Sequence, residues 1–195
     1  MKIKNISISE NFCIAFVLLL MISTLAIAPV NAQDFGKKIL GRWYVRTDDL
    51  AGRFTTHAVQ EYFLNGTMNE ERQTTVRLAQ KGFITSCYII KYYSWSMSGN
   101  ILFQQLLASN ATVDFVAING QDMSDSPYLN AAQEFCNENR NTLKTFQFKI
   151  IKVDEKEIIY SSLDSQGKEV IGTDLRTPYG MSKYKISKSE ILKAN

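Results

Sequence analysis

The sequence predicts an all-β fold: an antiparallel up-and-down barrel of about eight to ten strands, with one helix before the last strands. Two observations lead to this prediction. Runs of β-branched and aromatic residues show a one-sided apolar pattern, and tight turns separate most of them. Short-looped antiparallel strands must hide their edges, and closure into a barrel does this.

Residues 1–32 precede the predicted barrel and have the three zones of a secretory signal peptide. Lys2 and Lys4 form the positive first zone, an apolar stretch covers 12–28, and small side chains at 30–32 form the cleavage site. The alternative is an uncleaved membrane anchor, for which the apolar run is marginal. We expect a secreted or periplasmic protein with no stable membrane insertion after cleavage.

The rest of the chain fits one domain, with the barrel over 33–186 and a C-terminal tail over 187–195. The net charge of the whole chain is +3. No basic run is long enough to predict binding to nucleic acid or to an anionic membrane surface. We therefore expect no nucleic-acid partner.

Turn residues divide the chain into its strands. Asn65-Gly66 is the strongest hairpin signal, because both residue types tolerate the positive φ of a type I′ turn. Ser98-Gly99-Asn100 and Ser109-Asn110 are read as further turns. The predicted strands are 42–47, 55–64, 67–78, 83–97, 101–107, 112–118, 145–153, 157–163, 168–175 and 178–186.

The strand over 83–97 has one strongly apolar face. From Cys87 onward, Lys91 alone interrupts the apolar residues at its odd positions. The one predicted helix covers 127–138, where Ser126 is the expected N-cap and Pro127 takes the first helical position. Apolar residues follow it at helical spacing.

Two cysteines remain after the signal peptide, Cys87 and Cys136. An even pair in an oxidising compartment predicts one disulfide. The alternative is two buried free thiols.

Three motifs occur in order across about sixty residues: Gly41-x-Trp43, Tyr62-Phe63-x-Asn65-Gly66-Thr67, and Trp95-x-Met97-x-Gly99-Asn100. Together they resemble the bacterial lipocalin-like domains of the calycin superfamily. The resemblance implies a barrel whose closed end is plugged by Trp43, and by analogy the binding of small apolar molecules. Lipocalins also carry an Arg late in the barrel that packs across the Trp, of which Arg176 is a faint counterpart.

Aromatic residues on two adjacent predicted strands are the candidate ligand contacts. They could wall an apolar cavity whose mouth carries tyrosine hydroxyls, which suits an amphipathic ligand. The alternative is that they fill the core. These lumen candidates are Tyr88, Tyr92, Tyr93, Trp95 and Phe103.

The sequence contains no recognisable catalytic or metal constellation, so we predict neither an enzyme nor a cofactor. His57 is the one histidine, expected as a surface or hydrogen-bonding residue, and there is no nucleophile elbow. Asp114, Asp122 and Asp125 lack the spacing of a calcium loop. A weaker alternative is a hydrolase or isomerase that uses Glu61 or Asp114 inside the barrel.

The leading functional hypothesis is therefore non-catalytic binding of a small apolar or amphipathic molecule in the barrel cavity. The alternative is a protein-interaction module with a filled barrel, such as an inhibitor, chaperone or envelope accessory factor. Its partner would be another envelope or secreted protein.

Overall fold

The computed structural model describes residues 32–48, 53–78, 82–140, 144–164 and 166–193. Apart from Ala32, the predicted signal peptide lies outside these residues. The strands are β1 (Gly41–Asp48), β2 (Phe54–Tyr62), β3 (Thr67–Leu78), β4 (Phe83–Ser98), β5 (Ile101–Ile118), β6 (Gln121–Asp122), β7 (Thr145–Val153), β8 (Glu157–Leu163) and β9 (Glu169–Arg176). The helices are α2 (Ala32–Lys38), α3 (Tyr128–Arg140), η2 (Met181–Lys183) and α4 (Lys188–Lys193).

Eight of the described strands close into an antiparallel barrel, which confirms the predicted fold class. Each strand pairs with its neighbour in chain order from β1 to β5 and then from β7 to β9, while β5 pairs with β7 across the intervening segment. β9 returns to β1, where Trp43 pairs with Arg176 and Tyr44 with Leu175. The short strand β6 pairs with β5 outside the barrel.

The hairpin between β2 and β3 forms where it was predicted, but with a different turn. Gly66 has a φ of 79°, whereas the one described non-glycine residue with positive φ is Asn119. The predicted type I′ turn is therefore wrong, because it requires a positive φ at Asn65. Its side-chain oxygen instead accepts hydrogen bonds from the amide and hydroxyl of Thr67, at 3.0 and 2.7 Å. These two bonds form a local turn through the Asn65 side chain.

The predicted turn at Ser109-Asn110 is also wrong, because β5 runs unbroken through it. Ser109 pairs with Lys91 of β4. The pairing of β4 with β5 shifts register after Ser86 and after Tyr92. Such bulges bend a strand and increase its twist, so the long strand curls around the barrel without a break.

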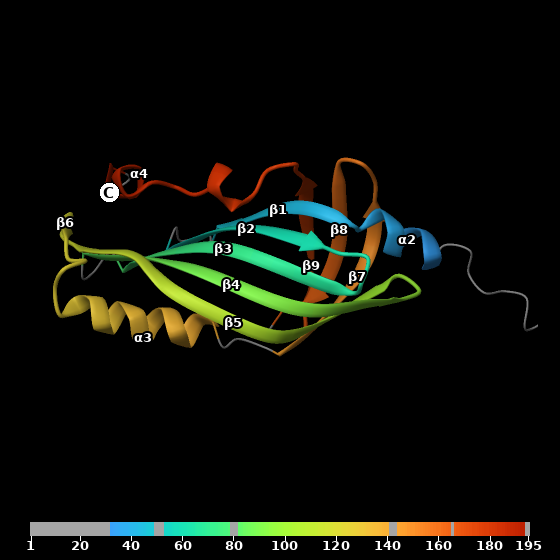
Figure 1. The fold of residues 1–195 in the computed structure, drawn as a ribbon, viewed down its shortest axis with the longest axis horizontal. Coiled ribbons are helices and arrows are strands. Elements are labelled where there is room, and N and C mark those ends of the chain that lie inside the picture. Colours follow the sequence, from blue (N-terminus) through green and yellow to red (C-terminus); the bar gives the residue numbers. More distant parts are fainter. Residues whose placement is uncertain (1–31, 49–52, 79–81, 141–143, 165, 194–195) are drawn as a thin grey trace, which may run out of the picture.

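The segment predicted as the final strand, 178–186, is not a strand. It contains η2, which lies against β2, and continues into α4, whose Ile191 packs on the outer face of β4 and β5 (Figure 1). We call residues 177–193 the C-terminal strap. Met181 and Ile191 are each 1% exposed, so the C-terminal strap packs on the barrel through both of its helices.

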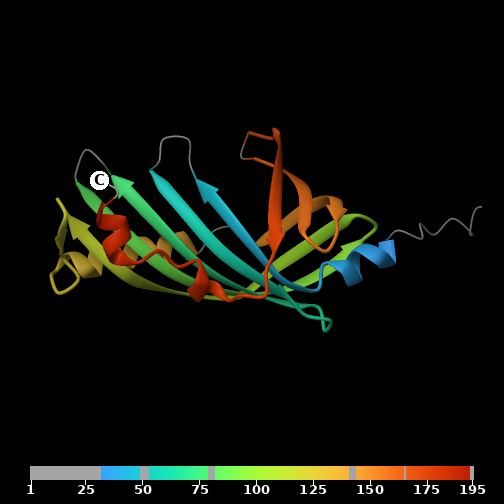
Figure 2. The same cartoon turned by 90° about the horizontal axis from the view of Figure 1, so that it is seen from above.

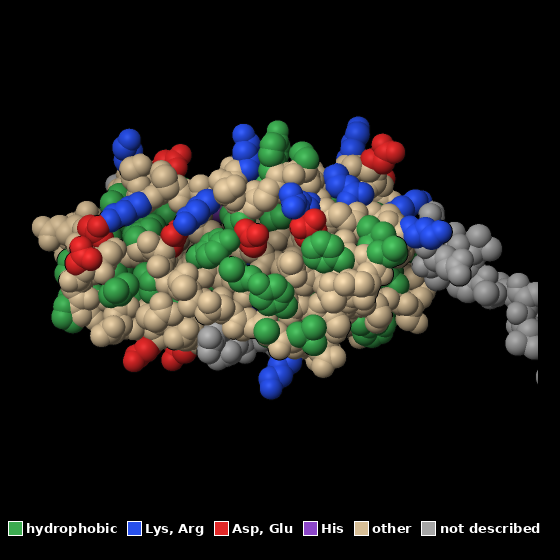
Figure 3. Space-filling model, in the orientation of Figure 1, with side chains coloured by type: hydrophobic (Ala, Val, Ile, Leu, Met, Phe, Trp, Pro, Cys, Tyr) green, Lys and Arg blue, Asp and Glu red, His purple; other side chains and the backbone are tan. Residues whose placement is uncertain are grey.

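Polar contacts fasten the C-terminal strap to the strands beneath it. The Tyr184 ring stacks on Tyr44 with centroids 3.8 Å apart. The side-chain amide of Gln73 donates to the Ile186 carbonyl and accepts from the Ile186 amide, at 3.0 and 2.8 Å. Lys185 forms an ion pair with Asp114 at 2.6 Å. Figure 3 shows basic and acidic side chains side by side on this face.

α3 lies where the sequence predicted a helix, and it runs beside β5 (Figure 1). The Ser126 hydroxyl accepts a hydrogen bond from the Tyr128 amide at 3.3 Å, as expected of an N-cap. The predicted disulfide is confirmed, since Cys87 of β4 is bonded to Cys136 of α3. Gln133 bonds the backbone of Ala111 in β5, beyond the part of that strand that pairs with β7.

Among the described residues, no helix combines the length and the apolar character needed to cross a membrane.

Candidate functional site

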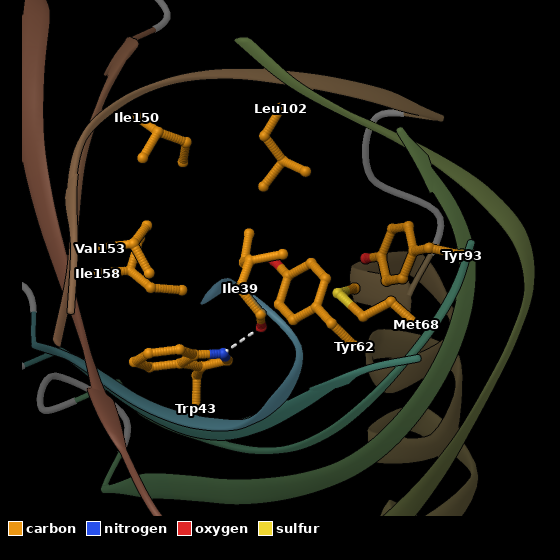
Figure 4. Packing of buried hydrophobic residues seen from close by; sticks show 9 residues of the cluster. All are labelled: Ile39, Trp43, Tyr62, Met68, Tyr93, Leu102, Ile150, Val153 and Ile158. Carbon is orange, nitrogen blue, oxygen red and sulfur yellow. Dashed lines mark hydrogen bonds between the residues drawn. The ribbon is translucent and has the colours of Figure 1, made fainter. Parts of the chain in front are cut away.

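The barrel interior has two parts, and the first is a densely packed closed end. Trp43 lies at its base, fully buried, and donates from Nε1 to the Ile39 carbonyl at 2.6 Å (Figure 4). Tyr62, Met68 and Tyr93 point into the same space (Figure 4). The cavity that remains has a volume of about 20 Å³. That volume suits about one water molecule.

Arg176 covers Trp43 at this end. Its guanidinium carbon lies 4.1 Å from the centre of the Trp43 ring, a cation–π contact, and Nη1 donates to the Leu40 carbonyl. Gly41 makes the approach possible, because a Cβ there would lie 2.6 Å from Nη1 of Arg176 and the φ of Gly41 is +101°. The glycine of the Gly41-x-Trp43 motif thus leaves room for Arg176 to lie over the Trp43 ring.

The second part is an open chamber at the wide end of the barrel, with a volume of about 400 Å³. It lies where β2 to β4 extend past β7–β9, which cross them at one end (Figure 2). Thr56 and Thr74 face each other in its wall, with hydroxyls 3.1 Å apart. The other lining residues are Arg53, Phe54, Arg72, Val76, Leu78, Ile89 and Phe135. Its volume falls within the range of small-molecule sites, about 300–1,000 Å³.

Strand alternation and the disulfide place these side chains. Thr74 and Val76 share the inner face of β3 with Arg72, because successive side chains of a strand point to opposite faces. Phe135 precedes Cys136, whose bond to Cys87 holds α3 against the inner side of β4. The helix therefore forms a wall of the chamber that no strand provides.

A chain of hydrogen bonds crosses the interior between the two parts. Gln104 donates to the Tyr62 hydroxyl at 2.6 Å, and Tyr62 donates to Gln60 at 3.1 Å. Gln60 then donates to Oε2 of Glu70 at 2.8 Å. Oε1 of Glu70 is 3.0 Å from Nη2 of Arg72, which lines the chamber. Oε2 of the buried carboxylate is therefore hydrogen-bonded, whereas Oε1 is held by the ion pair and has no hydrogen-bond partner among the described residues.

The charges of Glu70 and Arg72 each stabilise the ionised form of the other residue. Burial alone would raise the pKa of Glu70, but the charges of Arg72 and Lys91 and its hydrogen bonds outweigh burial and lower the pKa. Glu70 in turn raises the pKa of Arg72. Both groups are thus ionised at neutral pH.

Lys91 is a buried cation on the same inner face, 2% exposed, and its backbone is paired with Glu70. Within the described part of the chain its ammonium makes neither a hydrogen bond nor an ion pair, and Glu70 acts on it through space. Burial lowers the pKa of Lys91, and so does the charge of Arg72, while Glu70 opposes them.

Asp174 is a second buried carboxylate, at the closed end. It lines the small cavity and is 4% exposed, and its Oδ1 has no hydrogen-bond partner among the described residues. Burial raises the pKa of Asp174 to about 7, aided by the charge of Glu70 and opposed by a hydrogen bond from Tyr160.

The structure separates the five predicted lumen residues into two groups. Tyr93 and Trp95 belong to the interior cluster. Tyr88 lies on the outer face, where its hydroxyl donates to Glu71 and Lys185 lies over its ring. Tyr92 and Phe103 are also on the outer face, 46% and 38% exposed. These last three cannot touch a ligand inside the barrel.

The residues considered for catalysis also lie outside. Glu61 forms an ion pair with Arg42 at 3.0 Å, and Asp114 pairs with Lys185. His57 is buried under the C-terminal strap, with Nδ1 2.7 Å from the Tyr44 hydroxyl, and burial lowers the pKa of His57. In the described ranges, no group of histidine, cysteine and carboxylate side chains is placed to hold a metal ion.

The sequence reading missed Glu70, Arg72 and Asp174 as interior residues. Charged residues occupy three successive positions of β3, 70–72, so charge alone does not show which face is inside. Lys91 did give a signal, as the one interruption of an apolar face.

A scan of protein-family models found no match to this chain, and neither did a search of curated proteins.

Proposed function

We propose that this protein binds a small apolar or amphipathic molecule, without catalysis, in the open chamber at the wide end of the barrel. The observation that carries the proposal is the chamber itself: about 400 Å³, walled mainly by apolar side chains with two arginines and two threonines among them. Apolar walls favour the transfer of an apolar group from water, and a few polar groups orient it.

We also propose that the barrel is of the calycin type. Arg176 across the buried Trp43 at the closed end supports this, because lipocalins carry such an Arg, of which the sequence offered Arg176 as a faint counterpart. The disulfide supports a proposal that the protein works in an oxidising compartment, in keeping with the predicted signal peptide.

The test uses a neutral apolar fluorophore, N-phenyl-1-naphthylamine, whose emission rises in an apolar site. Thr74→Trp places a large ring in the chamber, and Thr112→Trp places the same ring on the exposed surface of β5. We expect saturable binding by the native protein and by T112W, with at least ten-fold weaker binding by T74W. Equal binding by both variants would place the fluorophore elsewhere and overturn the proposal.

The packed closed end favours one other candidate, the protein-interaction module. Its cavity of about 20 Å³ is far below the volume of a small-molecule site. A native mass spectrum of the protein purified from its own host separates the two functions. A small-molecule mass lost on denaturation supports the carrier. A bare polypeptide, together with no fluorophore binding, supports the interaction module.

A further inference from the structure

We propose that the chamber selects a singly charged amphipathic anion, whose acidic head lies at its floor beside Arg72 and Lys91 and whose apolar part lies along Ile89 and Phe135. This inference rests on the proposed binding function and names the class of ligand. It is carried by the charges of three interior residues and by the way that one carboxylate is held.

Arg72 lines the chamber, and Glu70 and Lys91 form the next inward pair below it; these three residues, which we call the floor of the chamber, carry one more positive than negative charge. Arg72 and Lys91 are positive and Glu70 is negative, and all three project from the inner faces of β3 and β4. A buried charge without a counter-charge is costly, because the interior solvates it poorly. An anion placed there would remove this cost.

Glu70 does not neutralise Lys91 by direct contact. Gln60 donates to Oε2 of the carboxylate at 2.8 Å, and Oε1 forms an ion pair with Arg72 at 3.0 Å without a hydrogen bond. Lys91 keeps three donors without a described acceptor, although its side chain is 2% exposed. Nε of Arg72 is a buried donor that has no hydrogen-bond partner in the described residues. Unused donors on two neighbouring cations form a site for an acidic oxygen.

The position of these donors suits the head of an amphipathic molecule. Arg72 lines the chamber directly, opposite Ile89 in the pairing of β3 with β4. Lys91 is the next inward residue of β4 beyond Ile89, one step deeper toward the closed end. Asp174 lines the other cavity and is not among the charges that act on Lys91. The anion would therefore enter head first, with its apolar part against the outer chamber walls.

The experiment compares three probes with the same ten-carbon chain: decanoate, decanol and decylamine. Binding to the full mature protein is measured by calorimetry at pH 7, below the concentrations at which the probes form micelles. Decanol is the more apolar molecule and partitions more strongly from water, so chamber walls alone would favour it over decanoate. We expect the reverse: decanoate at least ten-fold tighter than decanol, and decylamine weakest.

Two variants change the charge of the floor in opposite directions. Lys91→Met keeps the length of the side chain without its charge, and should reduce the preference for decanoate to less than three-fold. Glu70→Gln keeps an acceptor for Gln60 while leaving both cations, and should tighten decanoate binding at least three-fold. Lys149→Met, exposed on the outer face of β7, is the matched control and should change nothing. Melting curves show which variants fold. One folded floor variant is enough to test the proposal.

The outcomes separate the two proposals. Equal or tighter binding of decanol by the native protein would keep the binding function and overturn the anion site. A decanoate preference that survives in the folded floor variants would also overturn it. Binding of no probe at all would overturn the function and the anion site together.

Discussion

The two ends of this barrel differ in which elements surround the interior, and one is packed while the other is open. At the closed end, Trp43, Tyr62 and Met68 leave a cavity of about 20 Å³. At the wide end, the chamber measures about 400 Å³. The difference follows from strand length, since β3 to β5 have 12, 16 and 18 residues whereas β7 to β9 have 9, 7 and 8.

Because the strands differ in length, one end of the barrel contributes mainly to stability and the other mainly to binding. Where all eight strands meet, side chains from every direction fill the interior and leave a cavity of about 20 Å³. Where the short strands have ended, one helix held by a disulfide replaces them, and space remains. This predicts that changes at the closed end alter mainly stability and that changes at the wide end alter mainly binding.

The largest effect is expected from Trp43→Ala at the closed end. Loss of this fully buried ring leaves a cavity and removes the contact with Arg176, which should lower the free energy of unfolding by about 3–5 kcal/mol. Phe135→Ala at the wide end is the matched change and should cost less stability while weakening fluorophore binding. Urea denaturation measures the first effect. An unchanged melting temperature for W43A would exclude its structural role.

Asp174 should make the closed end sensitive to pH. In the native state it keeps its proton up to about pH 7, whereas in the unfolded chain it loses the proton near 3.8. The unfolded state thus binds fewer protons in this window, and stability decreases as pH rises from about 4 to about 7. The shift of about three units corresponds to about 4 kcal/mol at most.

Asp174→Asn removes the titrating group and should flatten this decrease. Thermal unfolding of both proteins from pH 4 to 8 tests it, and the difference in melting temperature should grow through the window in favour of D174N. Parallel curves for the two proteins would contradict a raised pKa.

Removal of the disulfide at the wide end should have an intermediate effect. The bridge joins residues 49 positions apart, and loss of such a constraint on the unfolded chain costs about 2–4 kcal/mol. The double variant Cys87→Ala/Cys136→Ala should also bind the fluorophore more weakly, because Phe135 is no longer held in the chamber wall. Thiol titration of the denatured native protein is the control: equal counts with and without reductant would mean that no bridge exists.

The smallest effect is expected at the C-terminal strap. Lys185→Met removes an ion pair with Asp114 whose lysine side chain is 41% exposed, so the cost should stay below about 1 kcal/mol. A double-mutant cycle with Asp114→Asn isolates the pair, and its coupling should decrease at high salt. Fluorophore affinity should not change, since both residues lie outside the barrel. A change in affinity would show that the C-terminal strap reaches the chamber.

Local patterns predicted most of the strands and the helix, because turn residues and caps act over a few positions. The break at Ser109-Asn110 failed because turn residues can also lie inside a strand when its neighbour holds it, and Ser109 is paired with Lys91. The final strand failed because the C-terminal strap is held by side chains such as Gln73 and by ring stacking on Tyr44, contacts with residues more than 100 positions away.

The site was harder to predict than the fold. The odd face of β4 was recognised as apolar, and Tyr93 and Trp95 do lie inside. Tyr88 and Tyr92, from the even face of β4, were also predicted to lie in the lumen, but they lie on the outer face. The inward placement of three charged residues, Glu70, Arg72 and Lys91, depends on barrel closure, which no local pattern contains.

Closure of the barrel between its first and last strands has a kinetic consequence. β1 and β9 meet through two residue pairs, and Arg176 reaches a carbonyl 136 positions earlier in the chain. Contacts between such distant residues require a large loop to close first, so they form late and slowly. The sheet from β1 to β5 can assemble in sequence while its two outer strands still expose unpaired edges. Until β9 is available to pair with β1, this intermediate is the state most exposed to aggregation.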